Sequence, residues 1–177
     1  MQSWYESRNR QQRNEEKADE VIKIIKKSGG EAKFLQTDVS IAEDVKALID
    51  YTLSEYGEFQ YAFNNSGLLG DLEPIASQAP DKSSYIVDVN IKGVIDCMYY
   101  QISAMIKYVN QSKPCSIVNN SSILSHNAYP GITVYSATKH AVSGLNKRCG
   151  SRTSSIKYKN KCCRSWPNQY SNDTNSN

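Results

Sequence analysis

The sequence lacks the cysteine and histidine spacing that a disulfide-bonded or metal-binding protein needs. It has five cysteines, an odd number, and no C-x-x-C pair in its 177 residues. Its two isolated histidines, His126 and His140, form no ligand cluster, so we expect no metal site. An odd and unpatterned set of cysteines is typical of free thiols in a reducing compartment. We therefore expect a cytoplasmic protein.

A long apolar run and a strong excess of charge are absent as well. The most apolar helix candidate, residues 94–109, contains Asp96 and Lys107, so we expect it not to cross a membrane. Glu6 and Arg8 interrupt any apolar core near the N-terminus, and we expect no signal peptide. With 21 Lys and Arg against 18 Asp and Glu, the net charge of +3 gives no electrostatic basis for nucleic-acid binding over the whole chain.

What the sequence does contain is a regular alternation of helix and strand patterns. We predict, in chain order, a helix over 14–28, a strand over 31–39, a helix over 40–56, a strand over 59–65, a helix over 81–108, a strand over 115–120 and a helix after the turn at 129–131. This alternation is typical of an α/β fold, in which crossover helices connect the strands of a parallel sheet.

Polar residues gather where three of these predicted strands end. Asp38 ends the first strand, N-N-S-G (64–67) follows the second, and N-N-S-S (119–122) follows the third. In a parallel sheet, functional residues collect in the loops beyond the carboxyl ends of the strands. We therefore expect these three clusters to belong to one site.

Tyr135 and Lys139 lie one helical turn apart in Y-S-A-T-K, and so on one helix face. An ammonium group beside a phenol favours the phenolate. Such a tyrosine can give a proton to a carbonyl oxygen or remove one from an alcohol. Ser122, at the end of the preceding strand, is placed to hydrogen-bond the same oxygen. Taken alone, the pair also fits an ordinary half-buried tyrosine beside a solvated lysine.

Five motifs in the same order resemble those of the classical short-chain dehydrogenase/reductase family, over most of residues 13–146. They are D-V-S at Asp38, N-N-S-G at 64–67 (with serine where the family usually has alanine), V-N-I-K-G-V around Asn90, S-I-V-N-N-S-S ending in Ser122, and Y-S-A-T-K at 135–139. The resemblance implies a Rossmann-like, doubly wound parallel sheet. It also implies a truncated one, because the family's first βα unit and last strands have no counterpart here.

The resemblance implies a role for each matched residue. Tyr135 is the implied acid/base, Lys139 favours its phenolate and holds the nicotinamide ribose, and Ser122 orients the substrate oxygen. Asn90 is implied to maintain a proton relay, although an asparagine also suits an ordinary helix position. The implied cofactor contacts are Arg13, Asp38, Val39, Asn64, Asn65, Ser66, Gly67, Tyr135 and Lys139. Asp38 also fits a simple strand-end cap.

The implied reaction is hydride transfer between NAD(P) and a secondary alcohol or ketone. NADP or NAD would serve as cofactor. Arg13, just past the second-strand position, favours the 2′-phosphate of NADP, although an arginine at a helix start is also an ordinary solvated charge. The implied partners are a small-molecule substrate and, in an intact family member, further copies of the chain, with no nucleic acid and no membrane. Loops at 68–80 and 125–130 would shape the substrate pocket, but they carry no charge pattern that identifies the substrate.

The family's dinucleotide site opens with a strand and a glycine-rich turn, and no such turn precedes Arg13. Residues 1–12 resemble neither a strand nor a cap, and residues 147–177 resemble an irregular polar tail. We therefore predict a partial dinucleotide-binding and catalytic Rossmann domain over 13–146, flanked by two segments that are translated out of frame.

The genetic code permits a check of the out-of-frame hypothesis. Reading across Trp166-Pro167 with a one-base shift requires glycine, and allowed codons over 157–172 give a strand and a proline–glycine loop of the family's kind. The same shift across Trp4-Tyr5 also requires glycine. Sequencing the coding DNA tests the hypothesis, because one of its frames must encode these peptides.

A missing first strand would have severe consequences, since that strand is central in the 3-2-1-4-5-6 order of such a sheet. We expect exposed strand edges, aggregation, and weak or absent dinucleotide binding. One alternative is a non-catalytic remnant that at most associates with an intact homologue. Another is a nucleic-acid-binding tail, although a charge run is usually just solvated. The tail's basic and aromatic residues are Lys147, Arg148, Arg152, Lys157, Tyr158, Lys159, Lys161, Arg164, Trp166 and Tyr170.

Overall fold

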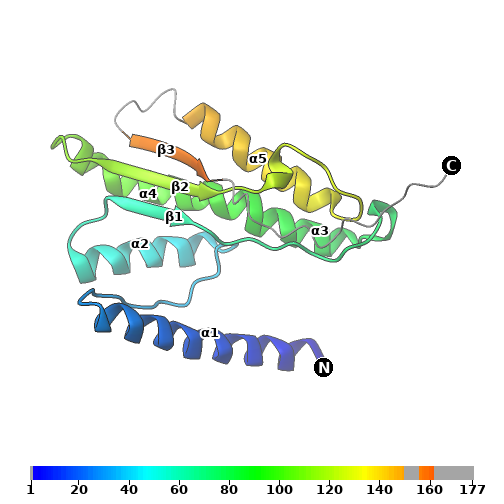
Figure 1. Cartoon of the computed structure of the whole chain (residues 1–177), viewed down its shortest axis with the longest axis horizontal. Coiled ribbons are helices and arrows are strands. Elements are labelled where there is room, and N and C mark those ends of the chain that lie inside the picture. Colours follow the sequence, from blue (N-terminus) through cyan, green and yellow to red (C-terminus); the bar gives the residue numbers. More distant parts are fainter. Residues whose placement is uncertain (1, 150–155, 162–177) are drawn as a thin grey trace. The chain divides into compact units, whose positions relative to one another are not determined.

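The computed structural model describes the backbone of residues 2–149 and 156–161, and the side chains of residues 15–147. The chain divides into two compact units, Met1–Asp38 and Val39–Asn177, which are described one at a time. Figure 1 shows the elements of both units coloured along the sequence.

The first unit consists of helix α1 (Gln2–Lys27) and the segment that follows it. The helix ends at a turn in which Gly29 has a φ of 80°, a backbone conformation that glycine adopts without strain. It begins well before the predicted start at Asn14. Residues 2–13 are rich in Gln and Arg, which are good helix formers, so this stretch extends the helix without an apolar stripe of its own.

The strand predicted over 31–39 is wrong, because residues 31–38 contain no regular secondary structure. A strand is stable only when its backbone groups pair with a neighbour, and none of the three strands in the described part of the chain includes this segment. Phe34 and Leu35, which suggested a buried strand, are exposed at 42% and 37%.

The second unit alternates helices and strands, as predicted. Its elements are α2 (Ala42–Tyr56), β1 (Tyr61–Asn64), η1 (Ile75–Ser77), α3 (Pro80–Val87), η2 (Asp88–Lys92), α4 (Gly93–Val109), β2 (Cys115–Asn120), η3 (Ile123–Ser125), α5 (Thr133–Cys149) and β3 (Ile156–Lys161). The strands form one parallel sheet in the order β1-β2-β3. This is a shortened Rossmann-like sheet, which confirms the predicted fold class.

β3 was not predicted, because it lies inside the segment expected to be an irregular tail. It pairs with β2 from Cys115↔Ile156 to Asn120↔Lys161, so the expectation is wrong for residues 156–161. In I-K-Y-K-N-K every second residue is lysine, and such a period of two is typical of a strand. The basic residues alone suggested a solvated tail. Residues 147–149 of the predicted tail belong to α5, and residues 150–155 and 162–177 lie outside the described residues.

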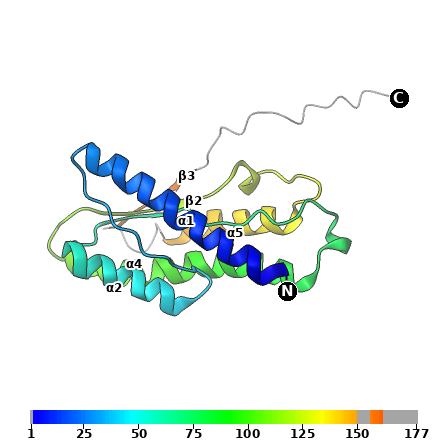
Figure 2. The same cartoon turned by 90° about the horizontal axis from the view of Figure 1, so that it is seen from below.

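The core of the second unit lies between the sheet and its helices. α4 packs against β1 and β2, α2 against α4, and α5 against β3, and Figure 2 shows these three helices on the same side of the sheet. Side chains of β2 are alternately buried and half-buried, as expected for a strand with one covered face. The main buried cluster comprises Ile49, Phe59, Met105, Tyr108, Cys115 and Ile117.

The helix predicted over 81–108 is present but is not regular. α3 continues into a π-helical turn, η2, and then into α4, without a break in the helical backbone. A π-helical turn accommodates one extra residue in an α-helix and is frequently found at functional sites. Asn90 lies in this turn, and its side chain is fully buried.

Candidate active site

The predicted acid/base pair and the predicted serine come from neighbouring elements. Ser122 follows β2 and is the N-cap residue of η3, while Tyr135 and Lys139 belong to α5. η3 packs directly against α5. The Lys139 Nζ atom lies 5.6 Å from the centroid of the Tyr135 ring. The structure therefore brings these three residues to the carboxyl end of β2.

Lys139 is a buried cation at the centre of this arrangement. Only 4% of the residue is exposed, and burial lowers the pKa of its amine because the charged form is poorly solvated. Its Nζ donates a hydrogen bond of 3.1 Å to the backbone oxygen of Asn120. A Cβ atom at Gly67 would lie only 3.4 Å from the same Nζ. Lys139 thus contacts the end of β2, the loop after β1 and the Tyr135 ring.

Ser122 is fixed in place by the short turn that follows it. Its Oγ accepts a hydrogen bond of 3.2 Å from the backbone N–H of Leu124. Its backbone oxygen accepts one of 2.7 Å from the Ser125 hydroxyl. Because Oγ acts as the acceptor in the turn, its own hydrogen is left to donate to a substrate oxygen.

Asn90 connects the loop after β1 to the helix that carries Tyr135. Its Oδ1 accepts from the Leu68 N–H at 2.8 Å, and its Nδ2 donates to the Leu68 oxygen at 2.9 Å. Nδ2 also donates to Thr138 Oγ1 at 3.0 Å, and that hydroxyl donates to the backbone oxygen of Tyr135 at 2.7 Å. The side chain of Asn90 is therefore committed to holding two segments of the site together.

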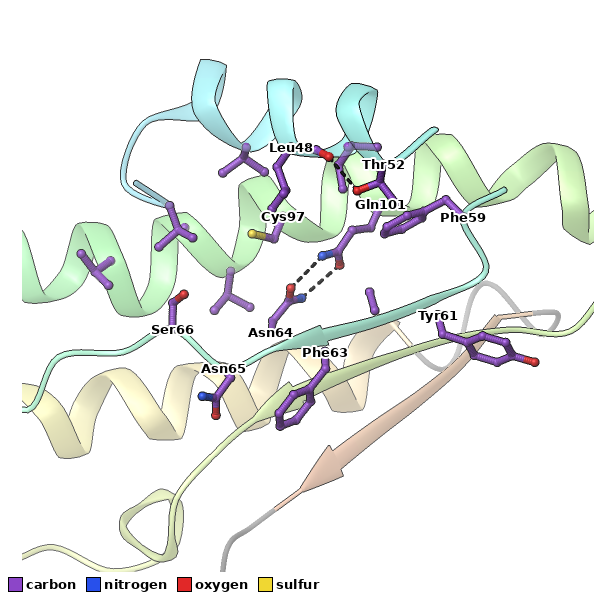
Figure 3. Close-up of a pocket in the computed structure, with 17 residues that line it drawn as sticks. Leu48, Thr52, Phe59, Tyr61, Phe63, Asn64, Asn65, Ser66, Cys97 and Gln101 are labelled. Carbon is purple, nitrogen blue, oxygen red and sulfur yellow. Dashed lines mark hydrogen bonds between the residues drawn. The ribbon is translucent and has the colours of Figure 1, made fainter. Parts of the chain in front are cut away.

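The loop formed by 64–67 is held by hydrogen bonds at Asn64 and Asn65, and at Leu68 just beyond it. Asn64 and Gln101 form a pair of amide hydrogen bonds, of 2.7 and 3.0 Å, which Figure 3 shows as dashed lines. Asn65 Oδ1 accepts from Asn120 Nδ2 at 2.7 Å. Ser66 and Gly67 are exposed. An exposed segment held by a rigid scaffold is a common form of ligand-binding loop.

A cavity of about 250 Å³ lies beside this loop. All four residues of β1 line it, and consecutive strand residues point to opposite faces, so the cavity follows the edge of β1. Residues of α2 and α4 complete its wall, as Figure 3 shows. Four predicted cofactor contacts line it, namely Val39, Asn64, Asn65 and Ser66. The predicted catalytic residues Asn90, Ser122, Tyr135 and Lys139 are not among the residues that line it.

The two remaining predicted cofactor contacts, Arg13 and Asp38, belong to the first unit. The Arg13 side chain lies outside the described residues. Their roles stay predictions.

Sequence reasoning missed the polar face of α5. Ser136, Lys139, Ser143 and Asn146 are all buried, at intervals of three and four residues. Ser121 Oγ, just after the end of β2, lies 3.1 Å from Ser143 Oγ. The helical spacing of small polar residues was the available signal for this face.

Within residues 15–147, no group of His, Cys, Asp and Glu side chains is placed to hold a metal ion. None of the described helices is both long and apolar enough to span a bilayer.

Comparison with known proteins identifies the family. The sequence model of the family described as short chain dehydrogenase matches residues 10–157, and the chain belongs to this family. An uncharacterized oxidoreductase of Listeria innocua, Lin0452, is 36% identical over 133 residues, which cover 75% of this chain and 52% of the relative. A 3beta-hydroxysteroid dehydrogenase of Mediterraneibacter gnavus is 33% identical over 135 residues, covering 76% and 47% respectively.

A solved structure supports the fold assignment. The short chain dehydrogenase/reductase from Burkholderia phymatum, crystallised in complex with NAD, superimposes with a TM-score of 0.77 at 24% identity, covering 84% of this chain and 53% of that one. The chain spans about half the length of the curated relatives described above.

Proposed function

We propose that this chain derives from an NAD(P)-dependent oxidoreductase that transfers hydride between nicotinamide and a secondary alcohol or ketone. The main support is the buried Lys139 amine, placed beside the ring of a half-buried tyrosine. The names of the relatives agree, since one is a dehydrogenase of a hydroxysteroid and one solved neighbour binds NAD.

The residues present fit a nicotinamide cofactor at the loop after β1. Gly67 has no side chain, and a Cβ added there would lie 3.4 Å from Lys139 Nζ. The glycine therefore leaves room for a ligand at this exposed loop to approach the amine closely. Asn64, Asn65, Ser66 and Gly67 would hold the cofactor together with Lys139. When bound, the nicotinamide supplies the acceptor or donor of the hydride. The preference for NADP over NAD depends on Arg13 and stays a prediction.

Residues of this chain would transfer the proton that accompanies the hydride. In alcohol oxidation the Tyr135 phenolate removes the hydroxyl proton as hydride leaves the carbon, and in ketone reduction the phenol returns a proton to the oxygen. The Lys139 ammonium stabilises the phenolate. The Ser122 hydroxyl donates to the reacting oxygen and stabilises charge that develops on it. Asn90 keeps the loop and the Tyr135 helix in register through Leu68 and Thr138.

Substitution of Tyr135 by phenylalanine tests the proposal. The ring is kept and only the phenol oxygen is lost, so turnover should fall by a factor of about 10² or more. The assay follows reduced nicotinamide by absorbance with a panel of secondary alcohols and ketones. Tyr99→Phe is the matched control, because this exposed tyrosine of α4 makes the same chemical change outside the site. Full turnover in Tyr135→Phe would refute the proposed role of the phenol. Absence of turnover in the parent chain would favour the non-catalytic remnant over an active enzyme.

A cytoplasmic location and assembly into a homo-oligomer of the family type stay predictions. We expect slow turnover and weak cofactor binding by the chain alone, because within its described part β1 pairs with a strand on one side only.

A further inference from the structure

We infer that Gln101 and Asn146 are positioning residues that set the affinity for the dinucleotide, through a chain of buried amides that crosses the sheet. The inference rests on the proposed function and extends it to two residues that do not belong to the matched motifs.

The first half of the amide chain connects α4 to β1. Gln101 is only 6% exposed, and both atoms of its amide bind the amide of Asn64. Gln101 Nε2 donates to Asn64 Oδ1 at 2.7 Å, and Gln101 Oε1 accepts from Asn64 Nδ2 at 3.0 Å. These two bonds determine which way the Asn64 amide faces.

The second half continues from β1 across β2 to α5. The other hydrogen of Asn64 Nδ2 goes to Asn119 Oδ1 at 2.6 Å. Asn119 Nδ2 then donates to Asn146 Oδ1 at 2.7 Å. Asn119 is fully buried and Asn146 is 6% exposed, so water does not compete for these bonds. The amides therefore form one directional series from Gln101 to Asn146.

This series joins the two halves of the site. Asn64 is the residue from which the cofactor loop begins, and Asn119 lies in β2, three residues before Ser122. Asn146 lies two helical turns beyond Lys139 on the same buried face of α5, where Ser143 also meets the end of β2 through Ser121. Loss of Gln101 leaves Asn64 Oδ1 without its donor. Loss of Asn146 leaves Asn119 Nδ2 with only the weak acceptor Met98 Sδ at 3.3 Å. The structure relieves the cost of such an unmade bond by shifting the loop or the helix.

Interrupting the amide series should lower the affinity for the dinucleotide as well as the stability of the fold. A ligand held between the loop and Lys139 requires the distance between them to be correct before it binds. A shift of that distance lowers affinity even in a chain that is still fully folded. A purely structural role would lower the melting temperature and leave the affinity of the folded chain unchanged.

The test is a set of leucine variants titrated with NADH and NADPH. Gln101→Leu and Asn146→Leu remove the amide with little change in volume. Binding is followed up to millimolar cofactor by the fluorescence of the reduced nicotinamide, at a temperature where circular dichroism shows each variant folded. We expect each variant to raise the dissociation constant about tenfold, which corresponds to about 1.4 kcal/mol. Gln111→Leu, the same change at an exposed glutamine, is the control and should leave it unchanged.

Two further variants separate a connected series from two independent sites. In the double variant the dissociation constant should rise about tenfold rather than a hundredfold, because both changes interrupt the same series. Asn146→Asp keeps an oxygen that accepts from Asn119, and should bind within about twofold of the parent. Leucine variants that bind as the parent does, or a double variant with a hundredfold effect, would overturn the inference alone. A parent chain that binds neither cofactor would overturn the proposed function, and this inference with it.

Discussion

Lys139 is the residue on which the electrostatics of the site depend most. Its amine is almost completely removed from solvent, with the Asn120 backbone oxygen as a hydrogen-bond acceptor. Among the residues whose side chains the structure describes, no carboxylate forms an ion pair with Lys139, so its charge is costly to bury. Buried charges of this kind are often found at functional sites. In the proposed mechanism, the function of this buried ammonium is to stabilise the Tyr135 phenolate.

The cost of burying Lys139 should depend on pH. Burial lowers the pKa of this amine below its usual 10.5, so between the two values the unfolded chain binds more protons than the folded one. The contribution of Lys139 to stability is therefore least favourable below its folded-state pKa and improves as pH rises from there to about 10.5. The free energy of unfolding of the parent, relative to Lys139→Met, should become more positive over this range.

Urea unfolding of both chains, followed by circular dichroism from neutral pH to about pH 10.5, measures this difference. Comparison of the two chains cancels the titration of the exposed lysines. A difference that stays flat or falls with pH would show that Lys139 is not desolvated in the folded state.

At the residue scale, the sequence identified the chemical groups but not most of their partners. Ser122, Tyr135 and Lys139 were predicted from motif order, and they lie at one sheet end. The hydrogen bonds of Asn90 to Leu68 and Thr138 were not predictable, because they join residues 22 and 48 positions apart in the chain. Such contacts follow from the tertiary arrangement, and no local pattern encodes them.

At the scale of elements, Gly93 allows α4 to lie close to the chain that enters α2. A Cβ atom at this position would be 2.8 Å from the backbone oxygen of Val39 and 3.2 Å from its carbonyl carbon. Backbone atoms cannot turn aside as a flexible side chain can. The glycine is therefore needed for space, although its φ of −58° is ordinarily helical.

Two glycine-to-alanine variants should change stability in opposite directions. Gly93→Ala should lower the free energy of unfolding by about 1–3 kcal/mol, because the added methyl group overlaps the Val39 backbone. Gly144→Ala is the matched variant in α5, where nothing lies within 4 Å of an added Cβ. It should raise the free energy of unfolding by about 0.5–1 kcal/mol, through helix propensity alone. Thermal or urea unfolding measures both, and equal effects would contradict the close approach at Gly93.

Elements with a strong local pattern were predicted well, and those that depend on neighbours were not. The apolar periodicity predicted the start of α2 to within two residues, and Gly57 ends the helix in a left-handed conformation. β2 was predicted with its observed bounds. The predicted strand over 31–39 and the unpredicted β3 both failed for one reason. Strand formation is decided by a pairing partner, which a single segment does not reveal.

At the scale of the whole molecule, the sheet of the second unit has helices on one face. Tyr61 and Phe63 of β1 are exposed at 64% and 57%. Parallel strands are normally covered on both faces, and among the described strands β1 pairs only with β2. These aromatic side chains and this edge of β1 therefore favour association between chains.

Phe63→Lys should reduce that association. A lysine on an edge strand opposes pairing with a second strand, because the charge would have to be desolvated. We expect less light scattering at a given concentration and temperature for this variant than for the parent chain. Leu72→Lys adds the same charge at a loop residue that is 66% exposed, and should change scattering less. An equal decrease in light scattering for both variants would show that the effect comes from net charge rather than from the edge of β1.

The π-helical turn at Asp88–Lys92 constrains how this chain can vary in length. Because the turn holds one residue more than a regular α-helix would, deleting a residue inside it should make 80–109 a regular helix while α4 keeps its rotation relative to α3. Deleting a residue within the regular part of α4 should instead rotate the helix beyond the deletion by about 100°. Met105, now fully buried, would then turn out of the core. The helix can therefore lose a residue at Asp88–Lys92 without losing its buried face, although the turn that holds Asn90 would change.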